Sequence, residues 1–238
     1  MRHRGRGLVV ILAAAGAGTA TVSCGGSPPP ASSSAPAQSS TTALGPPRPG
    51  PVPTGSSGPV VSPGHGWVAA SGLQGPVPGP GSCRDRSASD GGVLPDPACT
   101  PGAVDATVTQ ADLVTTLCRP GGYTRSVRPP ESLTEPFKAT VMRAYDATGA
   151  LGAYELDHLV PLELGGSSDT RNLWPEPDDR PGRGVANSKD RVERDLHDMV
   201  CAAVAGRPSV PLRVAQDLVA TDWTTAIPKA RAALVPAR

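Results

Sequence analysis

The stretch from Gly25 to Pro80 constrains the fold more than any other part of the chain. It contains 35 glycine, proline and serine residues among 56 positions, and Arg48 is its only Lys, Arg, Asp or Glu. Such a composition buries too little apolar surface to offset the entropy lost when a chain becomes ordered. We therefore expect a disordered tether over residues 24–82, with Trp67 as a solvated side chain, and one folded domain over residues 83–238.

The first 23 residues have the pattern of a secretory signal peptide. Three arginines among the first six residues precede an apolar run from Gly7 to Ala20 that is too short to span a bilayer. The following Thr21-Val22-Ser23-Cys24 resembles the lipobox of bacterial lipoproteins, in which the cysteine becomes the lipid anchor, although Thr21 stands where leucine is usual. The alternative is an ordinary secretory cut that leaves Cys24 lost or free. Either way we expect an exported protein, lipid-anchored on the outer face of the cell membrane or secreted.

The charge balance of the expected mature chain excludes one class of protein. Without residues 1–23 it has 19 basic and 21 acidic residues, a formal net charge of −2. A nonspecific DNA coat protein draws its affinity from neutralising phosphates, so this balance argues against one. A nuclease needs only a local groove and is not excluded.

Four cysteines remain if Cys24 carries lipid, and an exported small domain pairs such a set by default. Three pairings are possible, and we favour Cys83 with Cys99 and Cys118 with Cys201. A structural zinc site is the alternative, but the spacings are long and no Cys-x2-Cys is present.

Local patterns predict an α+β domain. Helices are expected at 110–118, from a capping-box pattern, and at 133–147; residues 123–127 should be extended. Residues 154–160 suit a strand, 165–169 a turn, and Leu173-Trp174 begins a second strand stopped by Pro175 and Pro177. A helix with apolar residues at i, i+4, i+7 and i+8 starts at Asn187, and two more are expected at 210–220 and 228–234. The order strand, loop, strand, loop, helix is that of a ββα unit within a mostly helical small domain.

The segment Tyr154-Glu-Leu-Asp-His-Leu-Val-Pro161, with Asn172-Leu173 and then Asn187, resembles the HNH (ββα-metal) endonuclease family. It is particularly similar to secreted actinobacterial proteins that carry Asp-His-Leu-(Ile/Val)-Pro-Leu-Glu-Leu-Gly-Gly and Asn-Leu-Trp-Pro-Glu-Pro. The likeness covers roughly residues 99–223. It implies the ββα-metal fold and nuclease activity.

The resemblance also implies roles for four residues. Asp157 would ligate a metal ion, His158 would be the general base, Asn172 would brace the loop that carries His158, and Asn187 would be the second metal ligand. Phosphodiester hydrolysis needs an activated water and a cation, and a neutral imidazole can accept the water's proton. Neighbouring residues of a strand point to opposite faces, so Asp157 and His158 serve one site only if the strand bends there.

Asn187 departs from many relatives, which have histidine at that position. Aspartate and asparagine oxygens favour Mg²⁺ or Mn²⁺ over Zn²⁺. Each residue also has a structural alternative: Asn187 with Asp190 is an ordinary helix cap, and Asn172 could close a turn after Asp169. Asp157-His158 could be a surface pair or the end of a strand.

The helix after Asn187 offers phosphate contacts. Arg191 and Arg194 fall on the face of Asn187, with Lys189 a weaker candidate, although Arg194 could instead pair with Asp190. His197 lies on about the opposite side and is expected to be structural or solvated. Three further acidic residues, at positions 155, 163 and 176, have no evident partner and are expected to be solvated.

We expect a metal-dependent endonuclease that acts on nucleic acid, DNA first, and touches the membrane only through its lipid. The rival is a surface lipoprotein that uses the ββα scaffold to bind an envelope component without cleaving. The four motif residues favour the enzyme; the acidic balance and the few aromatic residues favour the binder. Nothing in the sequence points to an oligomer.

Overall fold

The computed structural model describes residues 58–180 and 187–236, which form an α+β fold. Four α-helices contribute most of the regular structure: α1 (Glu131–Ala144), α2 (Ser188–Cys201), α3 (Leu212–Asp222) and α4 (Ala226–Ala232). The strands are short and pair two by two: β1 (Val60–Ser62) with β6 (Ala103–Asp105), β2 (Trp67–Val68) with β3 (Gly72–Leu73), β4 (Arg86–Ser87) with β5 (Val93–Leu94), and β7 (Tyr154–His158) with β8 (Leu173–Pro177). No helix in these ranges is both long and apolar enough to cross a membrane.

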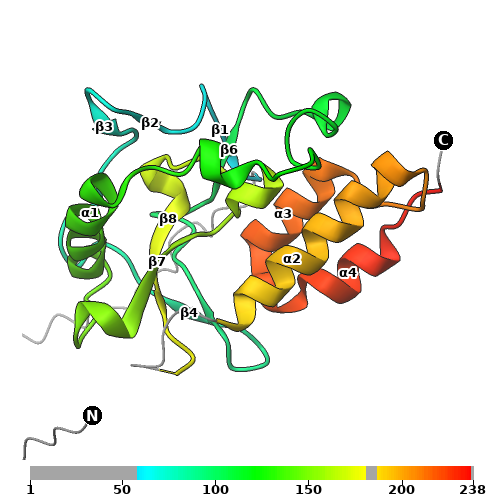
Figure 1. The fold of residues 1–238 in the computed structure, drawn as a ribbon. Coiled ribbons are helices and arrows are strands. Elements are labelled where there is room, and N and C mark those ends of the chain that lie inside the picture. The colour runs from blue at the N-terminus through cyan, green and yellow to red at the C-terminus, as the bar shows by residue number, and fades with distance from the viewer. Residues whose placement is uncertain (1–57, 181–186, 237–238) are drawn as a thin grey trace, which may run out of the picture. The chain divides into compact units, whose positions relative to one another are not determined.

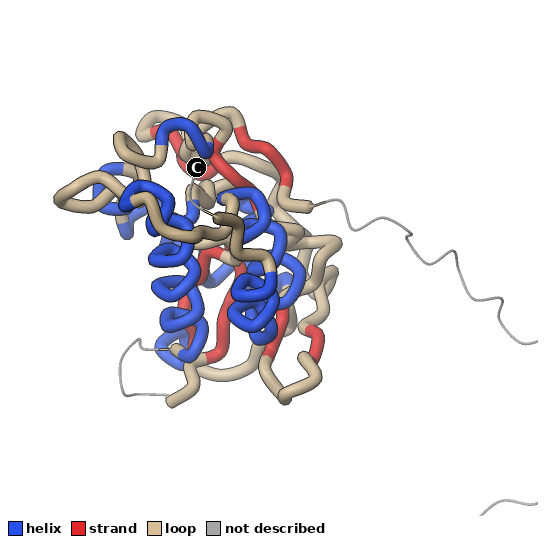
Figure 2. The backbone as a smooth tube through the Cα atoms, turned by 90° about the vertical axis from the view of Figure 1, so that its right-hand side faces the viewer, coloured by secondary structure: helices blue, strands red, loops and turns tan. Residues whose placement is uncertain are grey.

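The antiparallel pair β7–β8 lies between two groups of helices (Figure 1). On one side α1 packs against β8 through Phe137 and Val141, which contact Leu173 and Trp174 in a buried cluster. On the other side α2, α3 and α4 pack together around a second core that includes Leu196, Val200 and Val219. Figure 2 shows these three helices side by side, with strands behind them.

The sequence predicts these central elements well. The helices expected at 133–147, 210–220 and 228–234 are present as α1, α3 and α4, shifted by a few residues. One detail of β8 is different: Pro175 and Pro177 belong to the strand instead of ending it. They alternate with Trp174 and Glu176, so their nitrogens lie on the unpaired edge of the two-stranded sheet, where no donor is needed.

Two local predictions before α1 are wrong. Residues 110–118 form a short 3₁₀ turn at Gln110–Asp112 followed by irregular turns, and residues 124–126 are a 3₁₀ turn where extended chain was expected. The hydroxyls of Thr115 and Thr116 both bond the carbonyl of Asp112, which competes with the regular helical ladder. Leu113 and Leu117 are nevertheless buried, as the helical spacing suggested.

The folded unit begins earlier than the composition predicts. Residues 58–82, expected to lie in the disordered tether, contain β1, β2 and β3, and β1 pairs in parallel with β6. Trp67 is not solvated: its indole Nε1 donates to the carbonyl of Val127 at 2.7 Å. This segment is ordered by backbone hydrogen bonds and close glycine packing, which a measure of apolar content does not detect. The signal peptide, Cys24 and the start of the tether lie outside the described residues.

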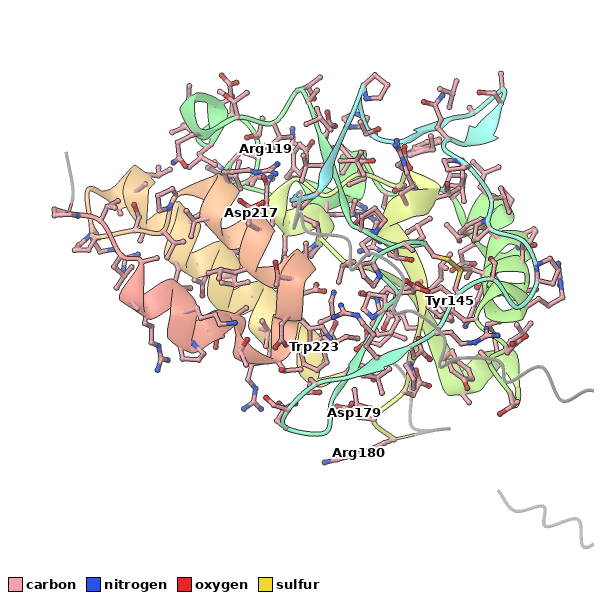
Figure 3. The ribbon with its side chains drawn as sticks, turned by 180° about the vertical axis from the view of Figure 1, so that it is seen from behind. Arg119, Tyr145, Asp179, Arg180, Asp217 and Trp223 are labelled. Atoms are coloured by element: carbon pink, nitrogen blue, oxygen red, sulfur yellow. A yellow bond between two sulfur atoms is a disulfide. The ribbon has the colours of Figure 1, made fainter. Side chains whose placement is uncertain are left out.

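Both favoured disulfides are present, Cys83–Cys99 and Cys118–Cys201. The first disulfide closes the segment 83–99, which contains β4 and β5 and precedes β6. Two aromatic side chains from distant parts of the chain, Tyr145 and Trp223, also hold this region and are labelled in Figure 3. The hydroxyl of Tyr145 bonds Thr100 Oγ1 at 2.7 Å, and Trp223 Nε1 donates to the carbonyl of Val93 at 3.0 Å. Disulfides of this kind indicate an oxidising, extracytoplasmic environment.

Candidate active site

One face of the β7–β8 pair is acidic. Glu155 lies opposite Glu176, and Asp157 lies opposite Trp174, and residues two apart on a strand share a face. Asp157 and Glu176 are buried, whereas Glu155 is partly exposed. The expectation of a solvated Glu176 is therefore wrong, because this side chain is buried in the fold.

Lys189 enters this acidic face from the first turn of α2. Its Nζ lies 2.8 Å from Asp157 Oδ2 and 2.5 Å from Glu193 Oε1, and it donates to the carbonyl of His158 at 2.9 Å. The side chain has no exposed surface. Lys189 is thus not free to hold a phosphate, as the sequence suggested, because its ammonium is enclosed by three protein oxygens.

The electrostatics of the face follow from this arrangement. Burial alone would lower the pKa of Lys189, but the surrounding carboxylates, led by Asp157, outweigh it, so the pKa of Lys189 lies above its usual range. Burial, reinforced by the Asp157 carboxylate, raises the pKa of Glu176 to about 9. At neutral pH the face holds a charged ammonium and a protonated Glu176.

The Asp157 carboxylate is already engaged. The same oxygen that meets Lys189, Oδ2, accepts a hydrogen bond from Trp174 Nε1 at 2.7 Å. Asp157 is 7 % exposed. Its position is fixed by one neutral donor from β8 and one cationic donor from α2.

His158 directs its side chain to other partners than Asp157 does. Its Nε2 lies 2.9 Å from Ser168 Oγ, and the ring is buried. Burial lowers the pKa of His158 to about 3, and the neighbouring Asp157 carboxylate only partly offsets this. The imidazole is therefore neutral at physiological pH and can accept a proton, but a pKa this far below neutrality makes it a weak base. Ser168 is itself fully buried, so its hydroxyl orients the ring and is not placed to attack a substrate.

Asn172 pins the loop that follows His158. Its Oδ1 accepts from the backbone N–H groups of Val160 and Ala103, and its Nδ2 donates to the carbonyls of Val160 and Ser167. The side chain has no exposed surface and uses its full set of four bonds. This is the bracing contact expected from the sequence; its importance for catalysis stays a prediction.

Asn187 sits at the start of α2 as its N-cap. Its backbone N–H donates to Asp190, and its Oδ1 accepts from the backbone N–H of Asp179 at 3.0 Å. Its Nδ2 is buried and has no hydrogen-bond partner among the described residues. The N-cap position agrees with the capping interpretation, and the hydrogen bond from Asp179 engages the side-chain oxygen that a metal would use.

The residues expected to hold a metal do not fit one as they are arranged. Oδ2 of Asp157 contacts an ammonium and an indole N–H, and Oδ1 of Asn187 accepts from a backbone N–H. Within residues 58–180 and 187–236, no three His, Cys, Asp or Glu side chains are grouped to hold a metal ion. We derive no step through a metal.

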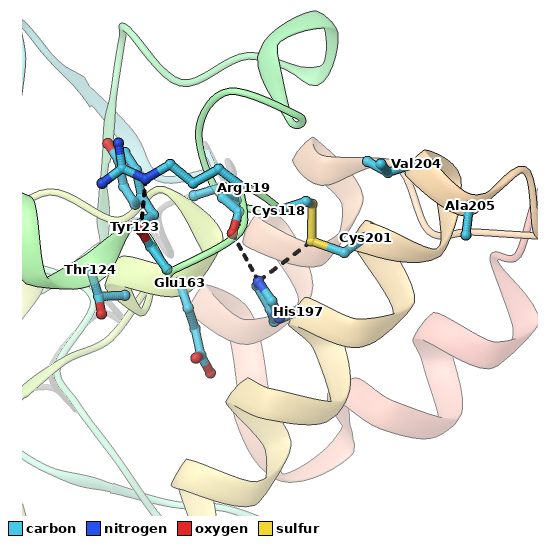
Figure 4. Close-up of a pocket in the computed structure, with 11 residues that line it drawn as sticks. Cys118, Arg119, Tyr123, Thr124, Glu163, His197, Cys201, Val204 and Ala205 are labelled. Carbon is cyan, nitrogen blue, oxygen red and sulfur yellow. Dashed lines mark hydrogen bonds between the residues drawn. A yellow bond between two sulfur atoms is a disulfide. The ribbon is translucent and has the colours of Figure 1, made fainter.

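The remaining candidates on α2 are two arginines and a histidine. Arg191 and Arg194 are exposed and available to solvent. His197 is structural: its Nε2 lies 3.2 Å from the carbonyl of Leu117 and 3.4 Å from Cys201 Sγ. Figure 4 shows it in a pocket of about 470 Å³ beside the Cys118–Cys201 disulfide.

Sequence reasoning missed one part of the site, the cover formed by residues 65–76. The carbonyl of His65 accepts from the N–H of Ser168, and Gln74 does the same for Thr170. His65 Nδ1 also contacts Asp105 Oδ2 at 2.5 Å. The sequence feature that could have indicated this ordered segment is His65-Gly66-Trp67, the one cluster of large polar and aromatic side chains within the glycine- and proline-rich stretch.

No model of a known protein family matches the chain, and no curated protein or solved structure gave a match.

Proposed function

We propose that the protein is an exported phosphodiester hydrolase of HNH type that cleaves nucleic acid, DNA first. The observation that carries this is the position of His158 at the end of β7, with its Nε2 2.9 Å from Ser168 Oγ, next to a loop that Asn172 holds with three hydrogen bonds. The order β7, β8, α2 agrees with the ββα unit of that family. The resemblance supplies the substrate class.

His158 would take a proton from the attacking water as its oxygen bonds to phosphorus. The bond from phosphorus to the 3′ oxygen then breaks, and that oxygen takes a proton, which leaves 5′-phosphate and 3′-hydroxyl ends. Arg191 and Arg194 stand exposed on α2, where guanidinium groups can hold phosphate oxygens. The resemblance implies Mg²⁺ or Mn²⁺ as the cation, so the test includes both.

The experiment is cleavage of supercoiled plasmid by the full chain, exported by a bacterial host so that both disulfides form. Wild type and His158→Ala are compared in Mg²⁺, in Mn²⁺ and in chelator, with His197→Ala as the matched control. We expect His158→Ala to lose about 10²- to 10⁴-fold in rate, while His197→Ala keeps cleaving. Cleavage that His158→Ala retains, or no cleavage by wild type in any condition, contradicts the proposal.

A second candidate is a non-catalytic lipoprotein that binds an envelope component. The observation that favours it is the enclosure of the motif: Asp157, His158 and Asn187 are 7 %, 8 % and 6 % exposed, and Lys189 occupies the Asp157 carboxylate. Co-sedimentation with purified peptidoglycan by a wild type that cleaves nothing would select this candidate.

We further propose that Cys24 carries the lipid that holds the protein on the membrane. The lipobox-like Thr21-Val22-Ser23-Cys24 supports it, and the disulfides support export. Wild type should partition into the detergent phase with lipid mass on its N-terminus, and Cys24→Ser should not. Equal partitioning of the two proteins rejects the anchor.

A further inference from the structure

Three oxygens from two elements surround one buried cation in this fold. The Asp157 carboxylate and the His158 carbonyl come from β7, the Glu193 carboxylate comes from α2, and all three contact Lys189 Nζ within 2.9 Å. Lys189 and Glu193 stand one helical turn apart, so a single turn of α2 supplies both the cation and one of its acceptors.

This oxygen set has the chemistry of a hard-cation site. Carboxylate and carbonyl oxygens are the ligands that Mg²⁺ and Mn²⁺ use in proteins. A divalent ion at Asp157 Oδ2 would meet the Lys189 ammonium on the same oxygen, and like charges at such a distance repel strongly where water is excluded. The ion and the ammonium therefore compete for one position.

We propose that Lys189 fills the cation position of this site, in place of the divalent metal that the HNH resemblance implies. Lys189 has no exposed surface, so it acts as a positioning residue: it neutralises Asp157 and holds the backbone of His158, and it does not touch the substrate. The catalytic consequence, cleavage that chelators do not inhibit, rests on the proposed function. The occupancy of the cation position does not.

The test titrates the full chain with Mn²⁺ and follows free Mn²⁺ by electron paramagnetic resonance. Lys189→Met removes the ammonium and keeps the chain length, and Lys138→Met is the matched control on α1. Wild type and Lys138→Met should show no Mn²⁺ binding that depends on Asp157. Lys189→Met leaves the three oxygens without their cation and should gain at least about tenfold in Mn²⁺ affinity.

Two results would overturn the proposal: a saturable Mn²⁺ site in wild type that Asp157→Asn abolishes, or a folded Lys189→Met protein that binds no more Mn²⁺ than wild type. If Lys189→Met does not fold, the proposal is tested by the midpoint of thermal unfolding of wild type alone. The midpoint should be the same in Mn²⁺ and in chelator, and a rise with Mn²⁺ that Asp157→Asn removes refutes the idea. None of these readouts uses cleavage, so a failure of the nuclease proposal is seen separately.

Discussion

Asn172 offers the sharpest measure of how the candidate site is built. Its amide makes four hydrogen bonds to backbone groups of Ala103, Val160 and Ser167, and the side chain is fully buried. An intramolecular hydrogen bond contributes about 1 kcal/mol net, and an orphaned buried group costs about as much or more. Asn172→Ala removes all four bonds and leaves their backbone partners in a dry interior. We expect a loss of about 4 kcal/mol in the free energy of unfolding, a large share of the stability of a small domain.

The measurement is equilibrium unfolding in urea with both disulfides intact, compared at an unchanged m-value. Asn187→Ala is the matched control, because it removes another buried asparagine that accepts one backbone bond at a helix N-cap, and it should cost about 1 kcal/mol. Asn172→Asp separates shape from donor chemistry: it keeps the two accepted bonds but turns a carboxylate oxygen toward two carbonyls. It should be no milder than Asn172→Ala. If Asn172→Ala loses no more than Asn187→Ala, the loop is held by something other than this amide.

Two further predictions concern stability. Replacing both cysteines of the Cys118–Cys201 disulfide, which are 83 residues apart, should lower the free energy of unfolding by about 4.5 kcal/mol through loop entropy. Removing Cys83–Cys99, with a separation of 16, should lower it by about 3 kcal/mol. Equal losses of the two variants in urea unfolding would contradict this. Glu176, with its pKa raised to about 9, binds a proton in the fold that the unfolded chain releases above about pH 4.5, so it makes the protein less stable as pH rises through that window. Glu176→Gln should remove this pH dependence, so the midpoint of thermal unfolding of the variant should rise relative to that of wild type from about pH 5 to about pH 9. A difference in midpoint that stays constant across this range would show that Glu176 is ionised in the fold.

The sequence predicts what depends on local periodicity. The alternation around Leu156 and the i, i+4 spacing of Val192 and Leu196 are enough to place β7 and α2 and to order them as strand, strand, helix. The sequence also predicts two disulfides, because an exported domain with an even set of cysteines pairs them by default, and the favoured one of the three possible pairings is the one present. The role of Asn172 as a brace followed from its place in the motif, and the four bonds agree with it.

What the sequence does not predict depends on contacts between distant residues. A lysine on the first turn of a helix is normally solvated, and nothing local to Lys189 indicates that Asp157, 32 positions earlier, will face it across a buried interface. The burial of Glu176 has the same origin, since only the register of β7 and β8 and the packing of α2 decide it. A charged group in a protein core needs a partner. When tertiary packing brings that partner from a distant part of the chain, the spacing of apolar residues in the sequence does not predict it.

The cover over the loop shows a second way in which composition misleads. Gly66 has a φ of +79°, and a Cβ at this position would lie 2.0 Å from the backbone nitrogen of Asp169, so no other residue fits there. This close approach lets the carbonyl of His65 reach the N–H of Ser168, the residue whose hydroxyl holds the His158 ring. The glycine content that argued for disorder is thus what allows backbone to pack on backbone. Because Ser168 links the cover to the imidazole, the orientation of the proposed base depends on a segment that lies about 90 residues earlier in the chain.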